Sequence, residues 1–298
     1  MRKFWLENSE GKLWNLTSND LLHKDGSFFA DPEGLGIKTK ISSYEVENTF
    51  FIENVTTQAQ TISGDLYFID YDHYQRFVAF IGNVNTETQL KLYYSTTGKS
   101  YDNKLHKEWY KLVLISELKK GEINVKTSAL KVVVKFDCLS RWKQDKEVLL
   151  ELARTGDPLV YPYIYPYVYG GSNNLAVIID NTGNLPTSCR VKVEGVTNTP
   201  LLRLIQNNEI VDQAKYNVSI ADDSYLIVDS AANKQEATLY TKFGDVMMKE
   251  DVYNTGEKDY TFSNFITIPS GISTFLVSAI NSSFGKVTLS YSIQKELI

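Results

Sequence analysis

The chain has 298 residues, and its 31 Lys and Arg against 36 Asp and Glu give a formal net charge of −5. Hydrophobic residues make up 43% and charged residues 22%, which is the balance of a folded globular protein and not of a disordered one. The mild acidic excess argues against a dedicated nucleic-acid binder, and no run approaches the roughly 20 apolar residues of a membrane-spanning helix. The length favours two domains.

The residue mixture points to strands. The chain holds 19 Tyr, 14 Phe and 4 Trp, among many of the β-branched and turn-forming residues that are enriched in strands and loops. Its two cysteines, Cys138 and Cys189, are too far apart in sequence for a metal knuckle, and we expect both to be buried apolar fillers. The opening MRKFWLENSEGKLW lacks the apolar core of a signal peptide, so we expect folding in the cytoplasm.

The first residues read as short strands and turns. The predicted strands are Phe4–Leu6 and Leu13–Leu16, which form a hairpin, then Ile37–Glu47, Thr49–Asn54 and Thr61–Phe68. Residues 31–36 carry two turn signals and are predicted as a loop. Neither face of Ile37–Glu47 is cleanly apolar, so this strand is expected to be long and partly exposed.

One helix is predicted in the first half. Apolar side chains recur at helical spacing at Tyr71, Tyr74, Phe77, Val78 and Ile81. Asp70 can cap this run and Gly82 can end it, which predicts a helix that packs on a sheet. Strands are then expected at Gln89–Thr96, Glu108–Ile115 and Ala129–Phe136, with a polar loop over residues 97–107 between the first two.

A domain boundary is predicted near residues 140–150. A short helix over Asp145–Arg154 is expected there, followed by the Tyr/Pro stretch LVYPYIYPYVYGG at residues 159–171. Its prolines exclude a central strand, so we interpret it as an extended connector. Its tyrosines recur with a period of two and share one face, which is more typical of packing against a neighbour than of a ligand platform.

The second half alternates strands and turns with almost no helical period. The predicted strands are Ala176–Ile179, Arg190–Val196, Leu202–Ile205, Lys215–Ile220, Tyr225–Asp229, Glu236–Thr241, Phe265–Ile268, Thr274–Ile280 and Lys286–Ile293. Their spacing predicts an antiparallel β-sandwich. The fold class is therefore mainly β, with an N-terminal β-sandwich-like domain and one packed helix over residues 1–145, and a C-terminal β-sandwich over residues 146–298.

Catalytic equipment is not visible in the sequence. His23, His73 and His106 lack metal-ligand spacing, and there is no nucleophile-elbow, phosphate-loop or dinucleotide motif. Paired carboxylates such as Asp70 with Asp72 and Asp222 with Asp223 have structural explanations as helix-start and turn residues. The sequence therefore predicts no catalytic, cofactor or metal site, and a protein that is not an enzyme.

The order of the parts resembles the distal tail proteins (Dit) of long-tailed phages, which form the hub between tail tube and baseplate or tail tip. The stretches that carry the resemblance are QLKLYYST (89–96), WYKLVLISELKKGEI (109–123), LKVVVKFDCLSRW (130–142), IDNTGNLPTSCRVKVEG (179–195), YLIVDS (225–230) and FITIPSGISTFLV (265–277). No single motif is specific to the family. The resemblance rests on the occurrence of all of them, in the same order, along nearly the whole chain.

The resemblance implies a structural virion protein at the tail tip or baseplate, assembled in the host cytoplasm. Six copies would form a ring through the first domain, or two stacked rings, with a central channel for DNA passage and a galectin-like second domain outside. Its partners would be other copies, the tail tube protein, a tail-tip or tail-associated protein and a receptor-binding or fibre protein, with no membrane partner and DNA only in passage. The second half departs from relatives that carry a long receptor-binding arm, because no suitable insertion interrupts its strands.

Two interpretations remain open for the strand Ile37–Glu47 and the apolar residues after it. They either form an extended hairpin completed by the next subunit, or fill the core of their own domain. The candidate oligomer-interface residues are Ile41, Tyr44, Val46, Phe50, Phe51 and Ile52.

An alternative function of a different class is recognition of a host-surface saccharide through the C-terminal sandwich. Sugar binding by galectins uses a Trp stacking platform. All four tryptophans lie at or before Trp142, so the sandwich half has none, and this alternative is disfavoured.

Overall fold

A computed structural model describes residues 3–17, 25–82, 89–95, 109–123, 129–150, 175–280 and 286–298. The chain divides into two compact units. The first unit comprises Met1–Gln144 with Lys295–Ile298, and the second comprises Asp145–Gln294. The predicted loop over residues 97–107, the Tyr/Pro connector at 159–171, His23 and His106 lie outside the described residues.

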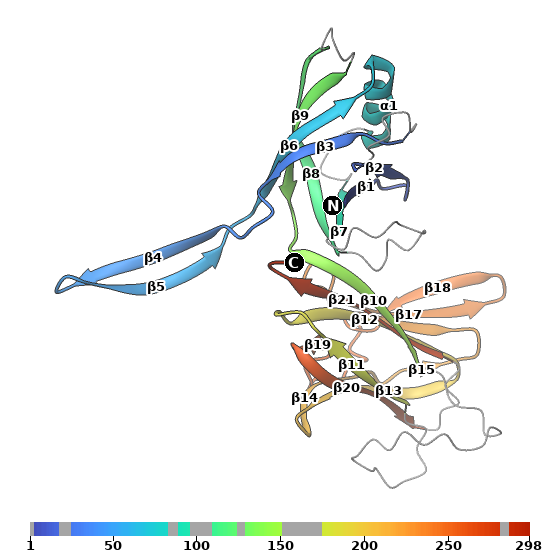
Figure 1. The fold of residues 1–298 in the computed structure, drawn as a ribbon. Coiled ribbons are helices and arrows are strands. Elements are labelled where there is room, and N and C mark those ends of the chain that lie inside the picture. Colours follow the sequence, from blue (N-terminus) through green and yellow to red (C-terminus); the bar gives the residue numbers. More distant parts are fainter. Residues whose placement is uncertain are drawn as a thin grey trace, which may run out of the picture. The chain divides into compact units, whose positions relative to one another are not determined.

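The first unit is built from strands and one helix (Figure 1). Its elements are β1 (Lys3–Glu7), β2 (Leu13–Asn15), β3 (Phe28–Glu33), β4 (Thr39–Val46), β5 (Thr49–Thr57), β6 (Thr61–Phe68), α1 (Tyr71–Ile81), β7 (Leu90–Ser95), β8 (Trp109–Ile123) and β9 (Leu130–Cys138). Antiparallel pairing joins seven of them in the order β2-β1-β7-β8-β9-β6-β3. Isolated bridges from residues 15 and 17 to residues 26 and 28 bring the two ends of this sheet together.

The core of the first unit follows from alternation along the strands. In β9, Leu130, Val132, Val134 and Phe136 are buried, as predicted, and Lys131 and Lys135 face solvent. The helix α1 spans the predicted residues. The Asp70 carboxylate accepts a hydrogen bond of 2.7 Å from the backbone N–H of His73, and Gly82 ends the helix with a φ of 62°.

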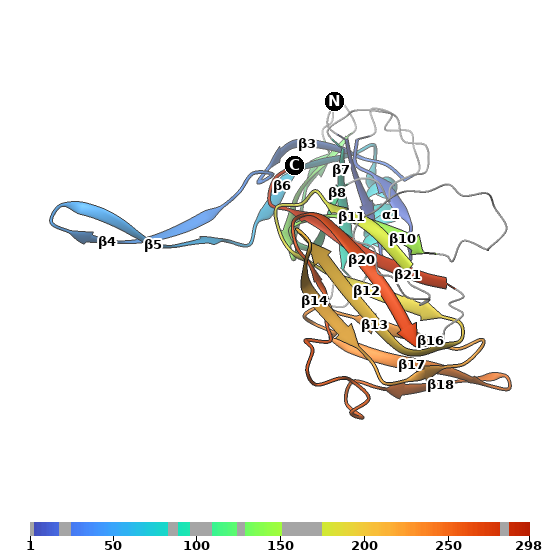
Figure 2. The same cartoon turned by 90° about the horizontal axis from the view of Figure 1, so that it is seen from below.

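The second unit is a β-sandwich (Figure 2). Its strands are β11 (Leu175–Asn181), β12 (Thr187–Glu194), β13 (Thr197–Gln206), β14 (Glu209–Lys215), β15 (Ser219–Ile220), β16 (Tyr225–Asp229), β17 (Glu236–Phe243), β18 (Val246–Asp251), β19 (Thr267–Ile268), β20 (Gly271–Ile280) and β21 (Lys286–Lys295). One layer runs β18-β17-β16-β12-β21 and the other β11-β20-β13-β14. Buried residues such as Val191 and Leu289 in the first layer and Leu204 and Phe275 in the second form its core. The described part of the chain is mainly β with one helix, as predicted.

Several predictions about single elements were wrong. Residues 142–150 form a strand, β10 (Trp142–Leu150), where a helix over Asp145–Arg154 was expected, because pairing and the burial of Trp142 and Leu150 override the helix propensity of the charged residues between them. The strand β18 was not predicted, since all six of its side chains are exposed and give no periodic signal. Residues 31–33 belong to β3 and not to a loop, and β8 continues beyond Ile115 to Ile123.

Candidate assembly interface

The strands β4 and β5 form a long hairpin, defined here as residues 39–57. They pair in antiparallel register from Thr39 opposite Thr57 to Val46 opposite Thr49, and they form a two-stranded sheet of their own. Glu47 and Asn48 make the turn with φ values of 49° and 62°, as a tight two-residue hairpin turn requires. Figure 1 shows this hairpin extending away from the other strands of the first unit.

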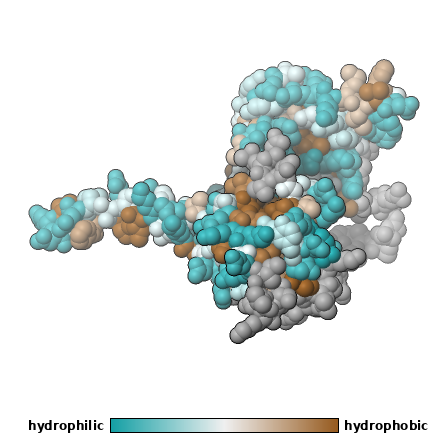
Figure 3. Space-filling model, turned by 90° about the horizontal axis from the view of Figure 1, so that it is seen from above, coloured by the Kyte–Doolittle hydropathy of each residue, from teal (hydrophilic) through white to brown (hydrophobic). Residues whose placement is uncertain are grey.

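The six predicted interface residues all lie on the long hairpin, and all are exposed. The exposed fractions of Ile41, Tyr44, Val46, Phe50, Phe51 and Ile52 range from 46% to 72%. The interpretation that they fill the core of their own domain is therefore wrong in the single chain. Figure 3 shows hydrophobic residues along the hairpin, interleaved with hydrophilic ones. A soluble chain rarely exposes such a run unless a partner covers it.

Both faces of the long hairpin carry apolar side chains. Successive strand residues point to opposite faces, and directly paired residues share a face. The register places Ile41, Phe50, Ile52 and Val55 on one face, which we call face A. Tyr44, Val46 and Phe51 lie on the opposite face, face B, where the rings of Tyr44 and Phe51 stack with centroids 5.7 Å apart. Val55 was missed by sequence reasoning, although it stands opposite Ile41.

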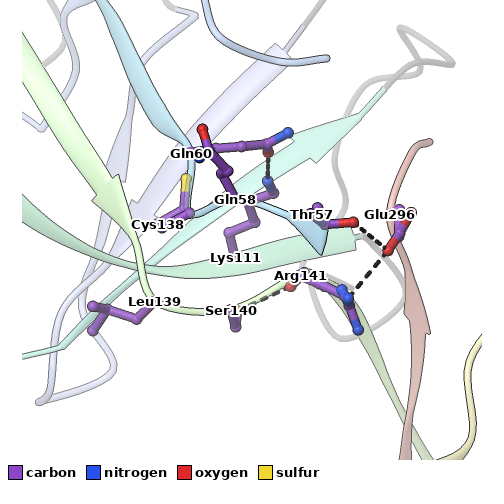
Figure 4. Close-up of a pocket in the computed structure, with 10 residues that line it drawn as sticks. Thr57, Gln58, Gln60, Lys111, Cys138, Leu139, Ser140, Arg141 and Glu296 are labelled. Atoms are coloured by element: carbon purple, nitrogen blue, oxygen red, sulfur yellow. Dashed lines mark hydrogen bonds and ion pairs between the residues drawn. The ribbon is translucent and has the colours of Figure 1, made fainter. Parts of the chain in front are cut away.

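The two strands of the long hairpin leave the sheet at the hairpin root, defined here as residues 36–38 and 57–60. Close to the sheet, the side-chain N–H of Gln60 donates to the Gly36 carbonyl, and the Lys111 ammonium donates to the Gln60 side-chain oxygen. Further out, the Thr57 hydroxyl donates to the Glu296 carboxylate over 3.0 Å, and Arg141 forms an ion pair with the same carboxylate over 3.1 Å. Figure 4 shows Thr57, Gln60, Lys111, Arg141 and Glu296 around a cavity of about 210 Å³.

Lys111 is the unusual group at the hairpin root. It is only 2% exposed, and no carboxylate of the described residues lies within ion-pair distance of its ammonium. The centre of the Trp142 ring lies 5.0 Å from its Nζ, so the ring face and the Gln60 side-chain oxygen both offer partial negative charge to the ammonium. Burial lowers the pKa of Lys111, and burial likewise raises the pKa of the nearby Cys138 thiol. The sequence indicates the burial of Lys111 only through the alternation of the strand, which places Lys111 on the same face as the buried Val113.

The other groups considered in the sequence have structural roles. Asp70 caps α1, and His73 is buried beside the rings of Trp14 and Phe68. Among the described residues, no three His, Cys, Asp or Glu side chains come together as metal ligands. The only α-helix in the described part of the chain, α1, is too short to cross a bilayer.

Comparison with known proteins gives a family match for the N-terminal part of the chain. Residues 3–139 match the family model described as the distal tail protein, N-terminal domain. The fold of the chain is similar to the Dit (gp 19.1) protein of phage SPP1, described as a hub of the adsorption apparatus, with 11% identity, 97% of this chain and 98% of that chain covered, and a TM-score of 0.58. No curated protein matches the chain.

The fold is also similar to chains of the phage p2 baseplate in its activated conformation. For the form with Ca, the identity is 14%, both chains are covered over 100%, and the TM-score is 0.64. For the form with Sr, the identity is 14%, the coverage is again 100% of both chains, and the TM-score is 0.63. These similarities show the fold.

The exposed hairpin, residues 39–57, lies within the residues that match this family model. Residues 3–139 therefore carry the N-terminal domain of the distal tail protein family, and the fold of the whole chain is similar to a phage hub protein and to phage baseplate chains.

Proposed function

We propose that six copies of the chain form a ring through the first domain (residues 1–145), with the long hairpin of each copy packed on the next copy. The observation that carries this proposal is the exposed apolar surface on both faces of that hairpin. Contacts between unlike surfaces generate a closed ring when the rotation between copies closes. Ile41, Tyr44, Val46, Phe50, Phe51 and Ile52 are the proposed interface residues.

The ring joins the tail tube protein on one side to a tail-tip or tail-associated protein on the other, and leaves a central channel for DNA passage. The net charge of −5 supports passage without retention, because tight phosphate binding needs clusters of Lys and Arg. The second domain (residues 146–298) lies outside the ring and is available to a receptor-binding or fibre protein. The chain acts by assembly and not by turnover, without a cofactor.

Saccharide recognition by the second domain has no supporting observation of its own. That domain contains no Trp. The large aromatic side chains that are clearly exposed on its described residues are Phe243 and Tyr260, which sit in separate segments of the chain. The structural function is therefore the one the geometry supports.

The mass in solution tests the proposal. Light scattering behind size exclusion should give six or twelve times 33.9 kDa for the unmodified chain. Phe50→Ser with Ile52→Ser on face A should give monomers with unchanged secondary structure, because both side chains are exposed in the single chain. Ile272→Ser removes an equally exposed side chain from the second unit and is the matched control, which should leave the ring intact.

Two outcomes contradict this proposal. Rings that persist when face A and face B are both made polar would show that the long hairpin is not part of the interface between copies. The proposed hexamer would be contradicted by two results together. The mass would correspond to a monomer at every concentration, and electron micrographs of the purified chain mixed with its tail tube protein would show no rings.

A further inference from the structure

The direction of the long hairpin is determined only at its root. Among the described strands, β4 and β5 pair only with each other. At the root, the backbone N–H of Gln58 donates to the Lys38 carbonyl over 2.8 Å, and the N–H of Cys138 donates to the Gln60 carbonyl over 2.8 Å. The first bond holds the two strands together, and the second attaches one of them to β9. Neither bond prevents the hairpin from rotating about its root. The direction of the hairpin therefore depends on the side chains around the root.

A small rotation at the root becomes a large displacement at the tip. Eight residues of β4 at about 3.3 Å each give a hairpin length of about 26 Å. A rotation of about 10° at the root therefore moves the tip by about 5 Å, roughly one strand spacing. Apolar side chains on the hairpin can meet a neighbouring copy in register only if the root is held firmly.

Lys111 connects the root to the sheet of the first unit. Its ammonium, from β8, donates to Gln60, and Gln60 in turn donates to Gly36 on the other side of the root. A single buried side chain is thereby linked to both strands as they leave the sheet. Burying an ammonium is unfavourable unless its donors are satisfied, so the Lys111 charge opposes any motion that withdraws the Gln60 oxygen.

Glu296 connects the root to a second place in the first unit. Its carboxylate accepts from Thr57, the last residue of β5, and pairs with Arg141, which lies between β9 and β10. Hydrogen bonds to a charged group are stronger than neutral ones. Figure 4 shows Thr57 and Arg141 directed at Glu296, while Lys111 is directed at Gln60.

We propose that Lys111 and Glu296 are positioning residues for ring assembly, which hold the root so that the long hairpin has the direction that the next copy requires. This inference rests on the proposed ring function. Neither side chain belongs to the proposed interface, so their effect on assembly passes through the hairpin.

The experiment measures the direction of the hairpin without assembly. Spin labels on Thr49→Cys near the hairpin tip and Gln75→Cys on α1 report the distance between tip and body, in the monomeric chain that carries Phe50→Ser and Ile52→Ser. The native cysteines are buried and do not take the label. This doubly labelled monomeric chain is the parent for the variants below. It should give one narrow distance distribution by pulsed electron–electron double resonance.

Glu296→Gln and Lys111→Met should each broaden this distance distribution. Thr57→Val removes the donor to Glu296 and should repeat the Glu296→Gln result. Gln60→Leu removes the acceptor of Lys111 and is the second variant should Lys111→Met fail to fold, and a distribution that stays narrow in it overturns the role of Lys111. Glu122→Gln neutralises an exposed carboxylate on β8 and is the matched control, which should leave the distribution narrow.

Assembly of the otherwise unmodified chain gives the second measurement. Loss of one charged hydrogen bond at the root should raise the concentration at which half of the chain is hexameric by about tenfold or more, with the melting temperature of the first unit almost unchanged. Glu296→Asp keeps the charge and should restore part of the assembly.

Failure of the inference and failure of the ring proposal are distinguishable. Distributions that stay narrow in Glu296→Gln and in Thr57→Val overturn the positioning role, whether or not rings form. Distributions that broaden, in a chain whose rings do not depend on the long hairpin, overturn the ring proposal, and with it the positioning role in assembly.

Discussion

Cys189 illustrates a residue whose behaviour follows from burial. Its thiol donates to the Ile266 carbonyl, the Ser230 hydroxyl lies beside it, and burial raises the pKa of Cys189 to about 12. Cys138 is also free and buried. The prediction that both cysteines are apolar fillers is confirmed by their burial, and a thiol held neutral in this way is a poor nucleophile.

Neither cysteine should react with iodoacetamide at pH 8 while the chain is folded. Burial raises the pKa of Cys189 to about 12, so its thiol stays neutral at that pH. Mass spectrometry should show the unmodified chain under native conditions and two added groups in urea. A rapid single modification of the native chain would contradict the burial of one of the two thiols.

Asp259 is a surface carboxylate whose hydrogen bonds favour its charged form. The Thr261 hydroxyl, the Thr261 backbone N–H and the Lys215 ammonium all donate to it, and they lower the pKa of Asp259 to about 2 from a usual value of 3.8. Because the pKa is lower in the folded chain, its stabilising contribution is complete above about pH 4 and disappears as the pH falls towards 2.

Asp259→Asn should therefore lower the free energy of unfolding at pH 7, and the difference from the parent should shrink as the pH falls through about 2. Urea unfolding across this range, followed by the signal of the second unit, should show a shallower acid limb in the variant. Asp222→Asn, an exposed turn carboxylate, is the control. A variant curve parallel to the parent between pH 4 and 2 would contradict the assignment.

At the scale of elements, α1 depends on a cap that the sequence already shows. The Asp70 side chain accepts the N–H of His73, one of the backbone donors that a helix start leaves without an intrahelical partner. Asp72 lies in the same first turn and interacts only with the helix dipole.

Asp70→Ala should lower the free energy of unfolding of the first unit by about 1 kcal/mol. Asp72→Ala should lower it by only about 0.3 kcal/mol, because a dipole interaction at an exposed site is weaker than a cap. Thermal unfolding monitored by circular dichroism compares the two variants. Equal losses would show that charge in the first turn, and not the cap, stabilises the helix.

The elements that could be predicted from the sequence are those with local signals. The helix α1 was predicted to its end residues, since its cap, its spacing and its terminal glycine all lie within 13 positions, from Asp70 to Gly82.

The strands β10 and β18 were not predicted, because non-local pairing decides the first and the second exposes every side chain. The two strands of the long hairpin were predicted, but their exposure was left open between two interpretations, because a pattern with apolar residues on both faces fits a core strand as well as an exposed one. The contact between Gln60 and Lys111 joins residues 51 positions apart and has no local signal.

At the scale of the whole molecule, the proposed ring relies on apolar contact more than on ion pairs. The long hairpin offers four apolar side chains on face A and three on face B. Hydrophobic contact is not screened by salt, whereas interactions between exposed charges are.

The fraction of hexamer should accordingly stay constant or rise as NaCl increases from about 0.1 M to about 1 M, where the screening length falls from about 10 Å to about 3 Å. Analytical ultracentrifugation at a concentration near the midpoint of assembly makes this measurement. Dissociation of the hexamer at high salt would assign the contact to ion pairs, such as those available to Lys40 and Glu45 of the hairpin.

The path of β21 adds a mechanical property. The strand pairs with β12 inside the second unit, and the chain then re-enters the first unit at Lys295, one residue before Glu296. Tension applied to the second unit along this strand therefore reaches Glu296 through covalent bonds, and the hydrogen bond from Thr57 to Glu296 carries it on to the hairpin root. The ion pair to Arg141 and the hydrogen bond to Thr57 are the contacts through which Glu296 would pass that force to the first unit.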